Sequence, residues 1–305
     1  GLISFSTNLE TFTVFRVCSF IVIIINLFIF LRIFHKLKIN INQQVYLVSI
    51  LIFNPYFVRY FLSLPTLIND LVFIFSGTLL LLSLLENKKK IFYLAIILGS
   101  VTRINAIFYI LAIVIAKIFL KKKFNFSFFE IGLSIFIFSI INLINNHHAN
   151  IVGSESHANV NMYDLKIRFG LFFQDYSIRE FLIFLLIPVF NFLPLGFLPF
   201  LFKLKFNLTS LIKDKTILVS AIVFLMICFT AYMAGPITSG KNIVRLINLS
   251  YPFIVYIIFK LIVNDIIFIN KIKKLIFFLF LVLWSLHPTY SIINIFNPLL
   301  QIFKY

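Results

Sequence analysis

Long apolar runs without any charged residue constrain this chain more than any other feature. Residues 20–31 and 71–85 are two such runs, and their apolar side chains would surround a helix on all sides rather than form one stripe. A membrane-spanning helix needs about 20 mostly apolar residues. Charged residues make up only 12% of the chain. We therefore predict an all-α, polytopic transmembrane protein with no soluble domain.

Basic residues outnumber acidic ones, which gives a formal net charge of +17. In a soluble protein this charge would suggest nucleic acid as a partner. Here the Lys and Arg residues lie in short clusters between apolar runs, at residues 32–38, 88–90, 121–123, 203–215 and 271–274. This pattern is typical of cytoplasmic loops. We expect membrane lipids and no nucleic acid as partners.

The length of the apolar runs and the basic clusters together predict about eight full spans. They lie at residues 11–34, 45–61, 65–85, 128–144, 181–202, 217–234, 243–263 and 275–286. We interpret the whole chain, residues 1–305, as one transmembrane domain. We also expect that a first span and a first outer loop precede Gly1, and that residues 145–176 form a loop on the outer side.

Residues 91–120 do not fit the pattern of single spans. A lysine cluster bounds each end, so both ends are predicted to face the cytoplasm. About 30 residues are too few for two full spans. Gly, Ser, Thr, Arg and Asn interrupt the apolar run at residues 99–105. The sequence therefore predicts a short, re-entrant-like hairpin that is broken near Arg103.

A second set of charged residues interrupts apolar stretches away from the cytoplasmic clusters. An ionisable residue in such a place is a functional candidate by default. The set comprises Arg59, Asp70, Arg103, Lys241 and Arg245. One interpretation is structural: Arg59 and Asp70 close the turn around Pro65 as a local ion pair, and the other cations reach lipid head groups. The alternative is that several of these cations converge on a lipid phosphate.

The predicted outer loop carries the remaining polar candidates. His147, His148 and His157 lie there with acidic residues, but their spacing matches no compact zinc motif. We therefore expect no defined cofactor. The alternative is a divalent cation. Glu155 and His157 are weak candidates for a general base.

Several short segments, in their order along the chain, resemble a GT-C glycosyltransferase. The nearest family is the α-1,2-glucosyltransferases that use dolichyl-phosphate-glucose to complete lipid-linked oligosaccharide. The segments are Gly1-Leu2-Ile3-Ser4, Phe15-Arg16-Val17, Asn54-Pro55-Tyr56 with Asp70, Thr102-Arg103-Ile104-Asn105 and Gly153-Ser154-Glu155-Ser156-His157. The resemblance covers roughly residues 1–175, and Lys241 to Arg245 is only loosely similar to a later motif.

This resemblance implies an enzyme that moves a hexose, glucose or mannose, from a polyprenyl- or dolichyl-phosphate carrier to a lipid-linked glycan or other acceptor. The reaction would occur on the lumenal or periplasmic face, in the endoplasmic reticulum of a eukaryote or the inner or plasma membrane of a bacterium. The main acidic residue, which would act as the catalytic base, is expected upstream of Gly1. The substrate and lipid phosphate would lie near Arg59, Asp70, Arg103, Asn105, Lys241 and Arg245.

Three other functions remain open from the residues alone. A lipid-linked sugar flippase or a polysaccharide polymerase would also need outer-side arginines, although a flippase should have charges along a continuous cavity. A small-solute transporter is disfavoured, because no pair of broken helices repeats in corresponding halves. A non-catalytic membrane subunit would bind no sugar donor.

Overall fold

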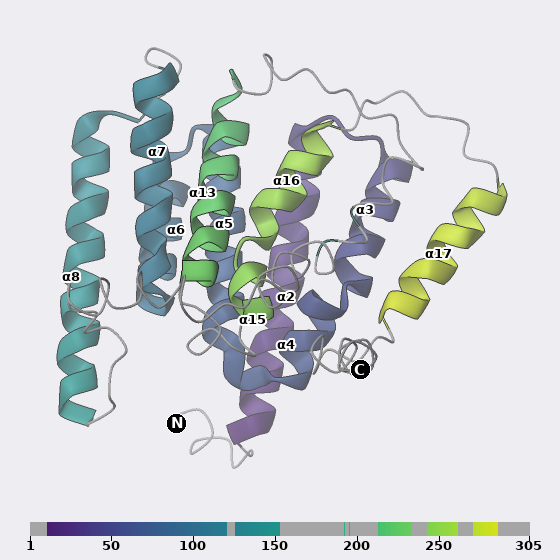
Figure 1. Cartoon of the computed structure of the whole chain (residues 1–305), viewed down its shortest axis with the longest axis horizontal. Helices are drawn as coiled ribbons and strands as arrows, with labels where there is room; N and C mark the ends of the chain where they lie inside the picture. The colour runs from purple at the N-terminus through teal and green to yellow at the C-terminus, as the bar shows by residue number, and fades with distance from the viewer. Residues whose placement is uncertain are drawn as a thin grey trace, which may run out of the picture.

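The structure is a computed structural model, and it describes residues 11–120, 126–152, 192, 195, 213–233, 243–261 and 271–285. Within these residues the chain is helical and contains no strand (Figure 1). The predicted all-α class is therefore confirmed for the part of the chain that the structure describes. The predicted span at residues 181–202 falls almost wholly outside it.

The helices follow one another closely in the N-terminal half and are more widely spaced afterwards. They are α2 (Thr11–Lys36), α3 (Ile41–Phe53), the π-turn η1 (Pro55–Arg59), α4 (Tyr60–Ser63), the 3₁₀-turn η2 (Pro65–Leu67), α5 (Ile68–Glu86), α6 (Lys89–Thr102), the 3₁₀-turn η3 (Ile104–Ala106), α7 (Ile107–Leu120), α8 (Phe128–Val152), α13 (Lys215–Met233), α15 (Ile243–Asn248), α16 (Tyr251–Leu261) and α17 (Lys271–Ser285).

Four helical stretches are long and apolar enough to cross a membrane, which indicates a membrane protein. They are Thr11–Lys36, Gln43–Ser63, Pro65–Glu86 and Phe128–Asn145. Shorter apolar helices cover Ile104–Leu120, Lys215–Ala231, Tyr251–Leu261 and Lys274–Ser285. The total of about eight spans stays a prediction.

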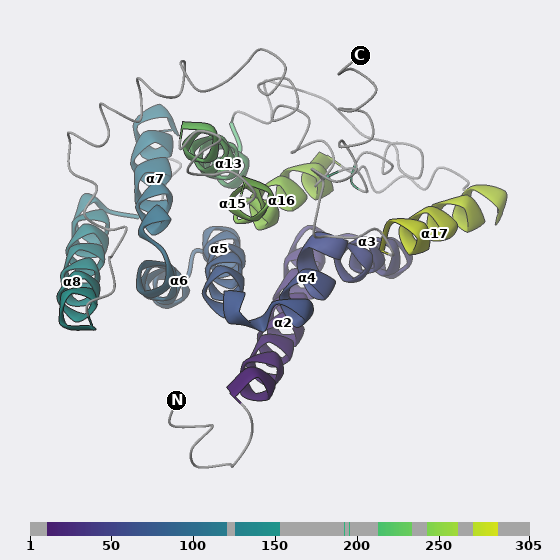
Figure 2. The same ribbon diagram turned by 60° about the horizontal axis from the view of Figure 1, so that its bottom comes forward.

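Helix α5 lies at the centre of the bundle. It packs between α2 and α6, with α13 and α16 along a third side (Figure 2). Its buried hydroxyls bond within the helix: Ser76 and Ser83 donate to the carbonyls of Phe73 and Leu80 at 2.6 and 2.7 Å. These bonds allow polar side chains to be buried among apolar ones, where an unpaired hydroxyl would be costly.

The peripheral helices present large apolar side chains to the outside. On α2, Phe28 is 66% exposed, and on α8, Phe129 and Phe136 are 79% and 62% exposed. Contact with water would be unfavourable for such a surface, whereas contact with lipid chains would carry no free-energy cost. The outer surface is therefore that of a membrane protein.

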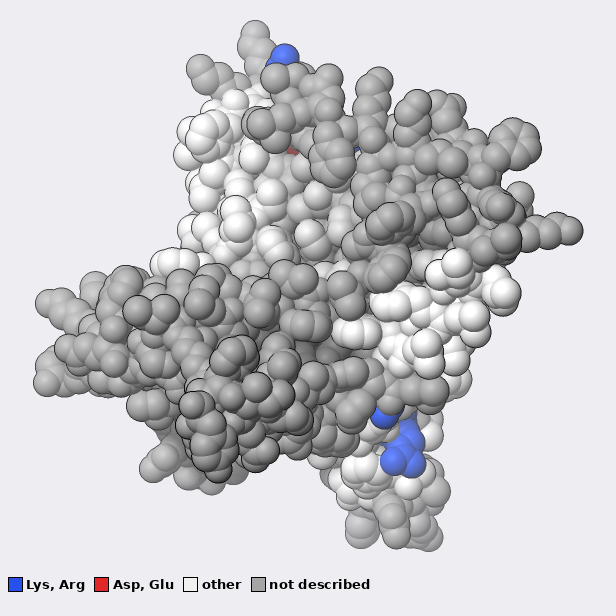
Figure 3. All heavy atoms as spheres, turned by 45° about the vertical axis from the view of Figure 1, so that its right-hand side comes forward, with Lys and Arg blue, Asp and Glu red and all other residues white. Residues whose placement is uncertain are grey.

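Ion pairs gather at one end of the bundle, which we call the lysine end. Arg32 of α2 binds Glu86 of α5 at 2.6 and 2.7 Å, and Lys88 approaches the same carboxylate at 3.1 Å. Lys89 pairs with Glu130 at the start of α8. In Figure 3, charged atoms of the described residues appear near the top and the bottom, and the described surface between them is white. The positions of the basic clusters fit the predicted alternation of helix directions.

The run at residues 91–120 is broken where the sequence predicts. Helix α6 ends at Thr102, Arg103 is extended with φ −153° and ψ 137°, and α7 begins at Ile107 after the η3 turn. Lys89 and Lys117 both bond to residues around the start of α8, so the two outer ends of this hairpin lie together at the lysine end. Each arm has 14 residues, or about 21 Å of helix, which is shorter than a hydrocarbon core of about 30 Å.

Two predicted spans are interrupted in the structure. Residues 45–61 do not form one α-helix, because Pro55 has no N–H and disfavours helix in the residue before it; Asn54 is extended with φ −67° and ψ 114°. Residues 243–263 break into α15 and α16 at the turn before Pro252. Helix α8 continues to Val152, so the loop predicted from Asn145 begins later than expected.

Candidate functional site: one carboxylate between two arginines

Asp70 lies in the first turn of α5, at the end of the bundle opposite the lysine end. We call this the Asp70 end. The carboxylate is fully buried, with a side-chain exposure of 0%. The N-terminus of a helix carries a partial positive charge, which favours a carboxylate at this position. A fully buried carboxylate also requires cationic or hydrogen-bonding partners.

Two arginines from distant parts of the chain supply these partners. Arg103 donates from Nε to Oδ1 of Asp70 at 2.7 Å, and its Nη2 contacts the same oxygen. Arg245 donates from Nε to the other oxygen, Oδ2. Asp70 therefore orients both guanidinium groups at once.

The break after α6 places Arg103. Its N–H donates to the carbonyl of Gly99 at 2.8 Å, and the Thr102 hydroxyl lies 2.9 Å from the carbonyl of Leu98. Gly99 permits the close packing, because a Cβ there would lie 3.1 Å from Oγ of Ser76. The side chain of Arg103 thus leaves the end of α6 toward α5. Asn105 follows in η3 and is half-buried.

A short helix places Arg245. Helix α15 has six residues and ends in a turn in which the Ser250 N–H donates to the carbonyl of Ile247 at 3.0 Å. Pro252 then lies in the first turn of α16, where its missing N–H costs nothing. Helix α16 packs against α5, since a Cβ on Gly77 would lie 3.0 Å from Cγ of Pro252. This packing holds α15 beside the first turn of α5.

The cluster of Asp70, Arg103 and Arg245 carries one net positive charge, because two guanidiniums face one carboxylate. The arginine side chains are 27% and 26% exposed, whereas the carboxylate is inaccessible. Each guanidinium has five N–H donors, and Asp70 takes only some of them. The arrangement can therefore bind an anion on its exposed side, with Asp70 as the residue that positions both cations.

The structure corrects the predicted partner of Asp70. The sequence allowed a local ion pair with Arg59 across the Pro65 turn. Instead Arg59, in η1, donates to the main-chain carbonyl of Ser285 at the end of α17. The local pairing was wrong because η1 presents Arg59 toward α17, whereas the first turn of α5 presents Asp70 toward α6 and α15.

The other predicted site residues are not brought into this cluster. Lys241, Glu155 and His157 lie outside the described residues. His147 lies on α8 and is exposed. In the described ranges no three His, Cys, Asp or Glu residues are grouped to hold a metal ion. The divalent cation therefore stays an untested alternative.

Sequence reasoning missed the role of Asn145. Its side-chain amide nitrogen lies 3.4 Å from the carbonyl of Ser100 and 3.5 Å from that of Val101, at the C-terminal end of α6. The last carbonyls of a helix lack partners within the helix. An asparagine in an otherwise apolar stretch was the available signal, but the sequence alone did not show which helix end it reaches.

Comparisons with models of known protein families, with curated proteins and with solved structures find no match for this chain. The likeness to the GT-C class therefore depends on the ordered short segments described above.

Proposed function

We propose that this chain is a membrane glycosyltransferase of the GT-C type. It would move glucose or mannose from a polyprenyl- or dolichyl-phosphate carrier to a lipid-linked glycan or another acceptor. The observation that supports this proposal most is the placement of Arg103 and Arg245 on the two oxygens of Asp70. Two oriented guanidiniums whose remaining N–H donors do not bond to Asp70 are suited to bind the phosphate of a lipid carrier.

The proposed reaction inverts the sugar's anomeric carbon. The acceptor hydroxyl oxygen bonds to this carbon while the bond from the carbon to the carrier phosphate breaks. The bonding electrons leave with the phosphate, and the hydroxyl proton passes to a general base, for which Glu155 and His157 are the weak candidates in this chain. Arg103 and Arg245, with Lys241 as a predicted third cation, would stabilise the growing phosphate charge.

Asp70 has a different part in this proposal from the one that the sequence suggested. Its carboxylate is buried and already bound by two arginines. It would repel a phosphate and has no open path to an acceptor hydroxyl. Asp70 is therefore a positioning residue, and not the general base.

The test uses the full-length protein in liposomes, with polyprenyl-phosphate-glucose or -mannose as donor and lipid-linked oligosaccharide as acceptor. Arg103→Lys and Arg245→Lys keep the charge but lose the fork of the guanidinium. We expect kcat/KM to fall at least about tenfold, since one charge-assisted hydrogen bond contributes roughly 1.5–3 kcal/mol. A melting temperature within a few degrees of wild type must accompany the loss.

Arg32→Lys is the matched control. Arg32 also binds a carboxylate through two hydrogen bonds, but at the lysine end. Its transfer rate should equal that of the wild type. If the wild-type protein transfers sugar from neither donor, the proposed enzyme activity is contradicted. If all three variants have equal rates, the proposed role of the arginines in binding the phosphate is contradicted.

A further inference from the structure

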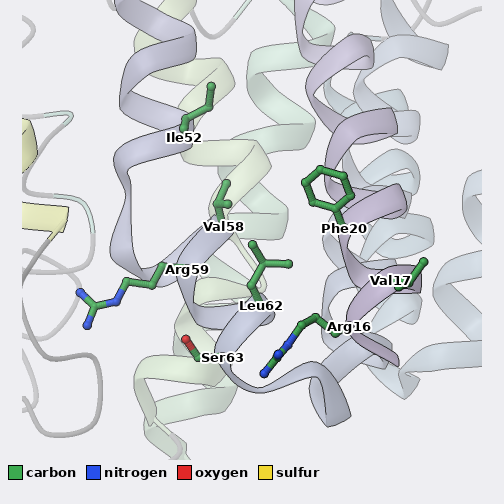
Figure 4. Close-up of a pocket in the computed structure, with 8 residues that line it drawn as sticks. All are labelled: Arg16, Val17, Phe20, Ile52, Val58, Arg59, Leu62 and Ser63. Carbon is green, nitrogen blue, oxygen red and sulfur yellow. The ribbon is translucent and has the colours of Figure 1, made fainter. Parts of the chain in front are cut away.

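A groove lies on the side of the bundle between α2 and the broken helix α3–η1–α4. Its volume is about 660 Å³, within the range of small-molecule sites. Apolar side chains form most of its walls, and the polar residues of its lining are Arg16, Arg59 and Ser63. The lining residues are Arg16, Val17, Phe20, Ile52, Val58, Arg59, Leu62 and Ser63 (Figure 4).

The walls of the groove face the surroundings of the protein and not its core. Val17 and Phe20 on α2 are 50% and 52% exposed, and Ile52 on α3 is 42% exposed. The break at Pro55 ends α3 and redirects the chain along the groove. In a membrane protein such a surface is open to lipid chains and unfavourable for water.

Arg16 lies at one end of this groove and points toward the α4 side, where Ser63 is located (Figure 4). The guanidinium carbon lies 4.8 Å from the ring centre of Phe12, so the aromatic face supports the cation. No carboxylate in the described part of the chain pairs with Arg16. Arg59 also lines the groove, but its guanidinium points away from Arg16 and donates to the carbonyl of Ser285 (Figure 4). Arg16, at the end of an apolar groove, therefore complements an anion with an apolar chain.

Helix geometry places Arg16 at the depth of Asp70. Arg32 of α2 binds Glu86 of α5, so these two positions are level. On α2, Arg16 precedes Arg32 by sixteen residues, or about 24 Å of helix. On α5, Asp70 precedes Glu86 by the same number of residues. Since a hydrocarbon core is about 30 Å thick, both positions approach the opposite membrane interface, where lipid phosphates lie.

We propose that this groove is a second lipid-phosphate site, separate from the cluster at Asp70. The lipid chain would lie along Val17, Phe20 and Val58, and Arg16 would bind the phosphate. The ligand is a lipid from the bilayer, and not free phosphate. This inference does not depend on sugar transfer, because it requires only the groove and its cation.

The test uses the full chain in nanodiscs of phosphatidylcholine that contain a small fraction of phosphatidic acid with a photoreactive diazirine in one acyl chain. After irradiation, mass spectrometry should find cross-links concentrated at residues 17–20 and 52–62. Unlabelled phosphatidic acid should compete, whereas further phosphatidylcholine and inorganic phosphate should not.

Two variants address the two parts of the site. Arg16→Gln removes the cation, and Val58→Trp fills the groove; each should lower cross-linking there about tenfold. The controls are Arg32→Gln at the lysine end and Phe28→Trp on the exposed face of α2. Both should leave the cross-linking at residues 17–20 and 52–62 unchanged. Labelling that neither groove variant lowers, or that inorganic phosphate abolishes, overturns the proposal.

Discussion

Arg103 and Arg245 meet across a single carboxylate, although 142 residues separate them in the sequence. Arg103 comes from the break of a short hairpin, and Arg245 comes from a helix of six residues. Asp70 connects them at the first turn of the central helix. The same contact therefore joins three parts of the fold and orients two cations at one end of the bundle.

Removing the central carboxylate should destabilise the protein. Asp70→Asn leaves two guanidiniums close together without a counter-charge, and losing one partner of a buried ion pair typically costs about 3–5 kcal/mol. We expect a clearly lower melting temperature, measured by size-exclusion chromatography of heated, detergent-solubilised protein.

Asp214→Asn is the control for this change. Asp214 lies 3.4 Å from Lys260, and both side chains are partly exposed. A pair of this kind contributes about 0–1 kcal/mol. Equal melting temperatures for the two variants would show that the Asp70 cluster stabilises little.

Close packing around Gly99 gives a second prediction. A Cβ there would lie 3.1 Å from Oγ of Ser76 and 3.2 Å from both Cβ of Ala106 and Cε2 of Tyr109. Gly99→Leu should therefore cost at least about 1–3 kcal/mol through overpacking. On α8, Gly132 has nothing within 4 Å of its Cβ position, so Gly132→Leu should be tolerated. The same heating assay compares the two variants, and equal loss in both would contradict the packing of α6 on α5.

The two ends of the bundle should lie on opposite sides of the membrane. We expect Lys38→Cys and Lys88→Cys to react with a membrane-impermeant maleimide from one side, and Thr66→Cys and Asn69→Cys from the other; all four positions are exposed. The background protein carries Cys18→Ala and Cys228→Ala. Labelling of all four positions from the same side would contradict the helix directions in the structure.

The length of the apolar runs and the positions of the charged residues predicted much of the fold. Long apolar runs predicted α2, α5 and α8, and two flanking lysine clusters predicted the hairpin of α6 and α7. These features are local, so the residues that cause them lie within the element itself. The broken helix at Pro55 was missed because the apolar composition of residues 45–61 outweighed the local effect of one proline.

The site was only half predictable. Asp70, Arg103 and Arg245 were identified individually, because charges inside apolar stretches are costly. Their grouping was not predicted, since it depends on how α5, α6 and α15 pack. The sequence allowed the nearest cation along the chain, Arg59, as a partner of Asp70, whereas the tertiary fold directs Arg59 toward Ser285.

The most direct measurement is the affinity of the full-length protein for polyprenyl phosphate, determined in detergent by tryptophan quenching or by isothermal titration. Arg103→Lys and Arg245→Lys should each raise the Kd about tenfold or more, because each loses directed hydrogen bonds to the phosphate. Arg32→Lys should bind as the wild type does. If all four proteins bind polyprenyl phosphate equally, or none binds it, then the arginines on Asp70 do not form a lipid-phosphate site.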